Sequence, residues 1–176
     1  SGIGLDSIHS VVTGCSVFQN GYFHGINLGH SGAPSDYSVV SNCTLHDIGN
    51  FATTQESNGI NVGNGSVNVC ISNCNIKTVH DNGIYLQSGQ NTAVSNCRIE
   101  GTNDHAFKLN VATGSKISNC IADSIGGSLV SEVGATNDDL WYEINETVFK
   151  RYGSVPHQGT FTPVLVGSAV SGDHTY

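Results

Sequence analysis

The fold is decided by one stretch of the chain, residues 72–97, which reads SNCNIKTVHDNGIYLQSGQNTAVSNC. The stretch opens and closes on the tripeptide Ser-Asn-Cys, and the same tripeptide occurs at residues 41–43 and 118–120. The cysteines of this series recur at intervals of 28, 31, 23 and 23 residues: Cys15, Cys43, Cys74, Cys97 and Cys120. A fixed motif at such intervals indicates structural repeats that stack into a solenoid.

A second motif keeps the same spacing. It is a small residue followed by an apolar, a mostly polar and an apolar residue, and it occupies residues 2–5, 25–28, 59–62, 83–86 and 106–109. Such alternation is typical of a half-buried strand. Two more short apolar runs in each repeat lie on either side of the tripeptide Asn, which can bend the chain sharply in the left-handed conformation. Each repeat therefore carries three short strands, and residues 128–130 open a sixth repeat.

These repeats predict an all-β protein, a right-handed parallel β-helix of about six coils with three short strands per coil. No long helical pattern separates the strands, so consecutive coils should stack as parallel strands. We expect the repeated Asn to form a ladder along the axis and the repeated Cys to form a buried stack. Three disulfides are the alternative for six cysteines. The stack is favoured because each tripeptide Cys opens a short apolar strand, and reduced thiols fit folding in a reducing cytoplasm.

The composition excludes several classes of protein. Six Lys and Arg residues stand against fourteen Asp and Glu, a net charge of −8, which disfavours nucleic acid and anionic membranes as partners. No run of about 18 apolar residues is present, so no transmembrane helix is predicted. The chain begins at Ser1 and contains no methionine, so we expect a fragment or a processed product. No cofactor or metal site is predicted: the cysteines repeat by coil instead of clustering as in zinc sites, and Asp138-Asp139, which could bind calcium, is better explained as a solvated acidic pair.

The spacing of the strands and of the bend Asn resembles the pectate-lyase-like superfamily over residues 2–148. The resemblance is specific for the fold and not for the activity, since that superfamily includes polysaccharide lyases, glycoside hydrolases, epimerases and viral tailspikes. After Val148 the register stops, and residues 159–167, GTFTPVLVG, are similar to segments that open the C-terminal domains of phage tail proteins. We therefore divide the chain into a parallel β-helix, residues 1–149, and a C-terminal extension, residues 150–176, which starts a β-rich trimerisation or capping region.

Together, the two resemblances imply a phage or prophage tailspike. Such spikes are homotrimers of the virion tail that are made in the bacterial cytoplasm and act outside the cell. They attach to the host by binding a bacterial surface polysaccharide, capsule or O-antigen, and often cleave it. We expect a depolymerase that hydrolyses this glycan internally. Two alternatives stay open: a polysaccharide lyase that acts by β-elimination, and a non-catalytic shaft that binds glycan or only spaces the tail fibre.

The candidate catalytic residues lie just before the first strand of the coil. The position two residues before that strand holds, in successive coils, Phe23, Ser57, Asp81, Asp104 and Gly126. Since neighbouring strands are about 4.8 Å apart, the carboxylates of Asp81 and Asp104 should lie about 5 Å apart, and those of Glu56 and Asp104 about 9–10 Å apart. Retaining glycosidases space their pair by about 5–5.5 Å and inverting ones by about 6.5–9.5 Å, so both pairings stay open. Turn formation alone is the competing explanation of the two Asp residues.

Six further residues border this patch as candidate substrate-binding groups: His24, Asn61, His80, Tyr85, His105 and Lys108. On the strands themselves we expect Asn27, Asn61, Tyr85 and Lys108 to point outward. Lys108 is the only cation predicted on this face, and Lys, His or Tyr could serve as the base of a lyase. Tyr22 and Phe23, next to His24, are expected to form an edge on which sugar rings stack.

Overall fold

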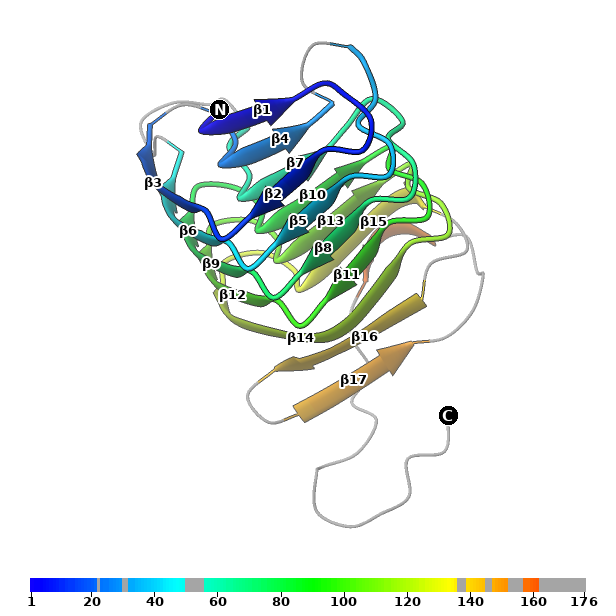
Figure 1. The fold of residues 1–176 in the computed structure, drawn as a ribbon. Coiled ribbons are helices and arrows are strands. Elements are labelled where there is room, and N and C mark those ends of the chain that lie inside the picture. Colours follow the sequence, from blue (N-terminus) through cyan, green and yellow to red (C-terminus); the bar gives the residue numbers. More distant parts are fainter. Residues whose placement is uncertain are drawn as a thin grey trace.

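The computed structural model describes residues 1–21, 23–29, 32–49, 56–135, 139–144, 147–151 and 157–161, and these form a parallel β-helix (Figure 1). The first strand of each coil contributes to one parallel sheet, in the order β1 (Ile3–Leu5), β4 (Ile26–Leu28), β7 (Ile60–Val62), β10 (Ile84–Gln87), β13 (Phe107–Asn110) and β15 (Val130–Ala135). The strands are in register, so that Ile60 lies opposite Ile26 and Ile84. The fold class expected from the repeats is confirmed.

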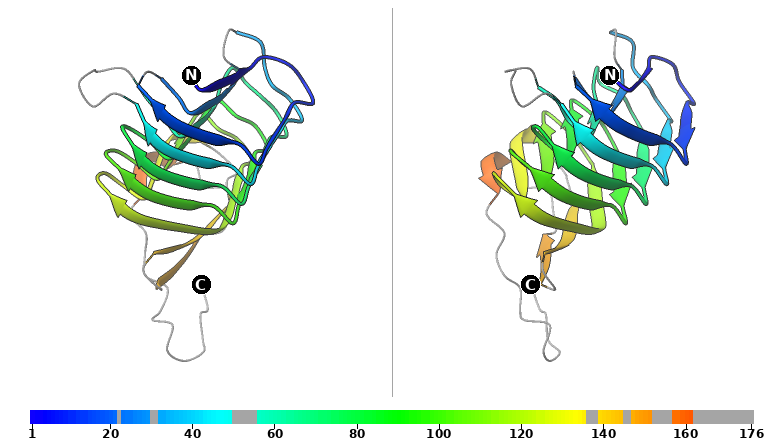
Figure 2. Two further views of the ribbon diagram at one scale, coloured as in Figure 1. Left: turned by 60° about the vertical axis from the view of Figure 1, so that its left-hand side comes forward. Right: turned by 90° about the vertical axis from the view of Figure 1, so that its left-hand side faces the viewer.

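The second sheet holds the other two strands of each coil. One column contains β2 (Val11–Thr13), β5 (Val39–Ser41), β8 (Cys70–Ser72) and β11 (Ala93–Ser95), the other contains β3 (Ser16–Asn20), β6 (Thr44–Ile48), β9 (Asn75–Val79) and β12 (Arg98–Thr102), and β14 (Lys116–Ile125) extends through both. Every neighbouring pair in these columns is parallel. Figure 2 shows the two sheets from other sides, with each column stacked along the axis of the β-helix. Three strands per coil are therefore confirmed.

The bend between the second and third strands is made by the tripeptide Asn, as expected. Asn42, Asn73, Asn96 and Asn119 have φ values between 51° and 54°. Their side chains are exposed at the corner of the coil. Buried hydrogen bonds between Asn side chains occur instead in the first sheet and just before it, from Asn61 to Asn27 and from Asn82 to Asn58. The Asn ladder is thus present, but in another column than the Ser-Asn-Cys motif indicates, because the bend turns its own Asn toward solvent.

The cysteines stack inside the β-helix and none is in a disulfide, which excludes the disulfide alternative. Cys43, Cys74, Cys97 and Cys120 are buried, whereas Cys15 and Cys70 are half-buried. Each of the four buried thiols donates to the carbonyl oxygen of the Ser two residues earlier, with sulfur–oxygen distances of 3.2 to 3.4 Å. Apolar columns of both sheets, such as Ile26, Ile60 and Ile84, complete the core around them.

The sixth coil is offset by one residue from the alignment made on sequence. Val130 lies opposite Phe107, so Leu129 and not Ser128 occupies the place of the small residue at the strand start. Gly127 consequently lies opposite Asp104, and Ser128 lies opposite His105. The alignment on sequence had placed Gly126 and Gly127 at these two positions. A Leu is tolerated there because the next strand beside β15 is not another parallel coil but the antiparallel β18 (His157–Phe161).

The parallel winding extends to β16 (Asp139–Ile144), which pairs with β14, and then reverses. The following strand, β17 (Thr147–Arg151), is antiparallel to β16. The division at residue 149 stays a prediction, and residues 152–156 and 162–176 of the C-terminal extension lie outside the described residues. Within the described ranges, no helix has the length and apolar character needed to cross a membrane.

The glycines at the strand starts allow the coils to approach one another. A Cβ added at Gly59 would lie 2.5 Å from the Gly83 carbonyl oxygen and 2.6 Å from Ile76 Cγ2. Gly25 and Gly83 are equally confined by the next coil and by a core side chain. Because one of the two nearest atoms at each of these glycines is a backbone carbonyl oxygen of the next coil, a side chain there must push two coils apart.

We expect Gly59→Ala to destabilise the protein by about 2 kcal/mol, the usual scale for overpacking a well-filled interior. The matched control is Gly21→Ala, because a Cβ at Gly21 meets nothing within 4 Å. Surface changes of that kind stay within about 0.5 kcal/mol. Urea unfolding of both variants measures the difference, and equal midpoints for the two would contradict the close packing at Gly59.

The stacked thiols should be protected from thiol reagents. Burial raises the pKa of Cys43, and a hydrogen bond with Cys120 raises the pKa of Cys97 to about 12. The reactive form is the thiolate, which is scarce at pH 8 for Cys43 and Cys97. The hydrogen bond with Cys97 lowers the pKa of Cys120, so Cys120 is protected by its burial alone. We expect Cys15 and Cys70 to react with an aromatic disulfide reagent in the folded state and the four buried cysteines to react only after unfolding. Mass spectrometry of the labelled peptides checks this, and fast labelling of Cys97 in the native protein would refute it.

Candidate functional site

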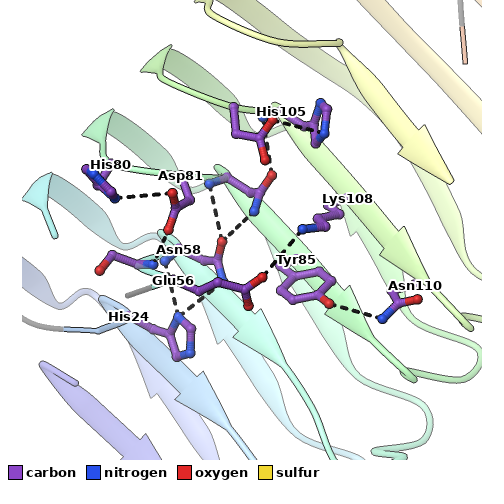
Figure 3. Close-up of polar contacts among 12 residues, drawn as sticks. His24, Glu56, Asn58, His80, Asp81, Tyr85, His105, Lys108 and Asn110 are labelled. Atoms are coloured by element: carbon purple, nitrogen blue, oxygen red, sulfur yellow. Dashed lines mark hydrogen bonds and ion pairs between the residues drawn. The ribbon is translucent and has the colours of Figure 1, made fainter. Parts of the chain in front are cut away.

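The candidate residues lie along the first sheet and at the corner that precedes it (Figure 3). One position at this corner forms a continuous column of hydrogen-bond acceptors, which we call the corner ladder: His24, Asn58, Asn82 and His105. Each acceptor receives the backbone N–H of the next coil, in the bonds Asn58 N to His24 Nδ1 (3.1 Å), Asn82 N to Asn58 Oδ1 (3.2 Å), His105 N to Asn82 Oδ1 (3.2 Å) and Ser128 N to His105 Nδ1 (3.0 Å). The ladder therefore ties five successive coils together where the loops meet the sheet.

The corner ladder also determines the tautomer of its histidines. Because His105 Nδ1 accepts from Ser128, the ring proton of the neutral side chain is on Nε2. His105 Nε2 lies 3.0 Å from Asp104 Oδ1 and donates to it. The structure thus orients the Asp104 carboxylate through a histidine that is itself held by the backbone of the next coil.

Asp81 lies one coil earlier and is held in a similar way. Its Oδ1 is 3.1 Å from His80 Nδ1, and its Oδ2 accepts the backbone N–H of Ser57. The backbone N–H of Asp104 donates to the Asp81 carbonyl oxygen at 3.1 Å, so the two Asp residues occupy adjacent coils. The Asp104 side chain is 42% exposed and that of Asp81 22%, which makes Asp104 the more open of the pair.

The column on the sheet itself is more closely packed than the sequence indicates. Asn27, Asn61 and Tyr85 alternate with core residues but are only 4 to 5% exposed. The Tyr85 hydroxyl accepts from Asn110 Nδ2 at 3.2 Å. Lys108 Nζ lies 4.9 Å from the centroid of the Tyr85 ring, so the aromatic face is covered.

Glu56 reaches across this column to the lysine. Its Oε1 is 3.6 Å from Lys108 Nζ, although the two residues start two coils apart (Figure 3). The lysine side chain is 22% exposed and the glutamate 57%. Lys108 is therefore held between a carboxylate and an aromatic ring and is not a free cation on the surface.

The structure brings most of the predicted residues into one region. His80 with Asp81, His105 with Asp104, and Glu56 with Lys108 form three pairs, and Tyr85 lies beneath the last of them. His24 belongs to the corner ladder, and Asn61 is bonded to Asn27 on the sheet. Phe23 is 44% exposed, whereas Tyr22, the other aromatic of the predicted stacking edge, and Asp138 lie outside the described residues.

Sequence reasoning missed the acceptor role of Asn58 and Asn82 and the contribution of Ser57 through its backbone. A signal was present, because the position before the strand start holds His, Asn, Asn and His in four successive coils. All four side chains can accept a hydrogen bond. The backbone N–H groups of this column donate to side chains, so acceptors are required at this position.

Two variants of His105 distinguish its contact with the Ser128 backbone from its contact with Asp104. His105→Asn keeps an acceptor of the type found at Asn58 and Asn82 but removes the proton donated to Asp104. His105→Ala removes both and leaves the Ser128 N–H without its acceptor, at a cost of about 1–3 kcal/mol. We expect the Asn variant to unfold close to the wild-type urea midpoint and the Ala variant well below it. Equal destabilisation of both variants would show that the ladder bond contributes nothing.

Comparisons with known proteins found one family model and several solved structures. No curated protein sequence matches the chain. The catalytic domain of a GH87 α-1,3-glucanase in complex with tetrasaccharides is 12% identical, with a TM-score of 0.49 over 77% of this chain and 27% of that one. Open reading frame 18 of Geobacillus virus E2 is 11% identical, with a TM-score of 0.49 over 86% of this chain and 38% of that one.

A third similar structure is the A-module of a mannuronan C-5 epimerase from Azotobacter vinelandii, which is 14% identical, with a TM-score of 0.45 over 82% of this chain and 45% of that one. The chain thus spans less than half the length of each of these three structures. A family model described as "right handed beta helix region" matches residues 1–140. With this match over most of its length, the chain belongs to the right-handed β-helix family.

Proposed function

We propose that the chain is part of a phage or prophage tailspike that binds a bacterial surface polysaccharide, capsule or O-antigen, and cleaves it by internal hydrolysis. The observation that carries the proposal is the placement of Asp81 and Asp104 at one position of adjacent coils, each beside a histidine. Turn formation explains one Asp at that position. It does not explain why both carboxylates are oriented by histidine side chains at the border of the outer sheet face.

The two carboxylates differ in a way that suits two roles. Both oxygens of Asp81 face donors, which fits an ionised group that attacks the anomeric carbon or activates water. Asp104 is more open and has an oxygen available to carry a proton to the glycosidic oxygen as the C–O bond breaks. When Asp81 is the nucleophile, the Asp104 carboxylate then takes a proton from a water whose oxygen attacks the anomeric carbon, so that the bond between the sugar and Asp81 breaks and both carboxyl groups are restored.

The spacing of the pair favours a retaining mechanism. Residues at one position of adjacent strands are about 4.8 Å apart, near the separation of about 5–5.5 Å that retaining glycosidases use. The other pairing, Glu56 with Asp104, would fit inversion. We assign Glu56 to holding Lys108 instead, because its carboxylate lies 3.6 Å from the lysine ammonium.

Replacing either Asp by Asn should lower depolymerisation by about 10²–10⁴-fold, the usual contribution of a general acid or base. Binding of the glycan should survive, since Asn retains the turn preference and most of the hydrogen bonds. Asp123→Asn is the control, because Asp123 lies on β14 of the other sheet. Release of reducing ends from capsule or O-antigen preparations measures the rate. Full activity in both single variants would exclude this pair, and binding without cleavage by the wild type would favour the non-catalytic shaft.

We also propose that the spike acts as a homotrimer located in the virion tail. The first coil carries exposed apolar side chains, Ile8 at 58%, Val11 at 67% and Phe18 at 59%. Clusters of exposed apolar side chains are commonly covered by another chain. Sedimentation equilibrium at micromolar concentration tests the assembly, and a monodisperse monomer would contradict it.

A further inference from the structure

The charges along the first sheet bear on the class of glycan that the site accepts, an inference that rests on the proposed function. Three carboxylates border the region and are partly exposed: Glu56 (57%), Asp81 (22%) and Asp104 (42%). Within the described part of the chain, Lys108 is the one Lys or Arg in this sheet. The other five are on strands of the second sheet: Lys77, Arg98, Lys116, Lys150 and Arg151. Counting carboxylates and Lys alone, three acidic groups and one basic group give these side chains a formal charge of −2, or −1 while Asp104 holds the proton that it delivers to the leaving group.

The single lysine is already engaged. Its ammonium lies 3.6 Å from Glu56 Oε1 and 4.9 Å from the centroid of the Tyr85 ring. A sugar carboxylate would have to displace Glu56 to pair with Lys108 and would add a negative charge to a region that Asp81 and Asp104 also border. Like charges brought together in a partly desolvated site oppose binding.

Uncharged polar groups are available beside these charges. Asn110 Nδ2 already donates to Tyr85, and the amides of Gln87 and Asn103 are exposed next to the same strands. Amides both donate and accept, which matches sugar hydroxyl and acetamido groups. A β-eliminating or epimerising enzyme instead needs a cation to stabilise the charge that develops on a uronate carboxylate when the neighbouring C–H loses its proton.

We propose that the site accepts a glycan whose sugars carry no carboxylate, built from neutral or N-acetylated hexoses, and that it discriminates against polyuronates. Glu56 is the specificity-determining residue, because it neutralises the lysine that could otherwise bind a uronate. Among the described residues, the same contact also leaves no unengaged Lys or Arg in this sheet to serve a lyase reaction.

An array of purified bacterial capsular and O-antigen polysaccharides of known structure, with and without uronic acids, tests the proposal on the whole protein. The informative variant is Glu56→Gln, which frees Lys108 and removes one negative charge. Its charge-matched control is Glu100→Gln on β12, where Glu100 pairs with Lys77 at 3.2 Å on the other sheet. Both variants change the net charge from −8 by the same single unit.

We expect the wild type to bind only glycans without uronic acids. Glu56→Gln should raise the affinity for uronate-containing glycans about 3–10-fold at low salt, with the gain shrinking as salt screens the charges, and Glu100→Gln should match the wild type. Uronate-containing glycans bound by the wild type and lost in Lys108→Gln would overturn the inference while leaving the proposed function intact. Failure to bind any glycan on the array would overturn the proposed function and this inference with it.

Discussion

In-register stacking of parallel strands, in which Ile26, Ile60 and Ile84 lie opposite one another, is the constraint on which the rest of this structure depends. At the corner before the first sheet, the backbones of neighbouring coils lie so close together that no side chain fits between them. The strand-start glycines satisfy that limit, because a Cβ at Gly59 would meet the carbonyl oxygen of the next coil at 2.5 Å. Stacking also lines up backbone N–H groups at the same corner, and each of them needs a hydrogen-bond acceptor. The side chains of the corner ladder accept these hydrogen bonds.

The candidate site follows from that arrangement. Stacking turns one position of the repeat into a column of neighbours, so a change from Ser57 to Asp81 and Asp104 in successive coils places two Asp residues at one position of adjacent coils. The corner ladder also orients Asp104. His105 accepts a backbone N–H with one ring nitrogen and donates to the Asp104 carboxylate with the other. In a scaffold of stacked coils, two substitutions at one repeat position therefore bring two acidic residues to adjacent coils without a change of backbone.

Much of the fold could be predicted from the sequence because its signals are local and repeat. The Asn bends, the three strands per coil and the buried cysteines all follow from residues within one coil, and the structure confirms them. The alignment of the sixth coil was wrong by one residue, because it placed Ser128 instead of Leu129 at the strand start. Every other coil has Gly or Ala at that position, but a small residue is not required where no parallel coil follows. The position of the Asn ladder was also missed, since the Ser-Asn-Cys motif reports the bend and not the side-chain bonds.

The candidate site was less accessible to sequence reasoning. Alignment of coils predicted that Asp81 and Asp104 share a position, which the backbone pairing bears out, while their chemistry stays a proposal. The contact between Glu56 and Lys108 crosses two coils and depends on long side chains, so no repeat position indicates it. Tyr85 is buried, with Lys108 over its ring and Asn110 bonded to its hydroxyl, and an alternating pattern alone does not predict that burial.

The decisive measurement is the depolymerisation rate of the double variant Asp81→Asn with Asp104→Asn, compared with each single variant under the same conditions. Residues that act together in one step are strongly non-additive, because removing either partner already abolishes that step. If the two carboxylates form one acid–base pair, the double variant will be no slower than the slower single variant. Losses that multiply in the double variant would contradict a shared step, and an unchanged rate would place the chemistry elsewhere.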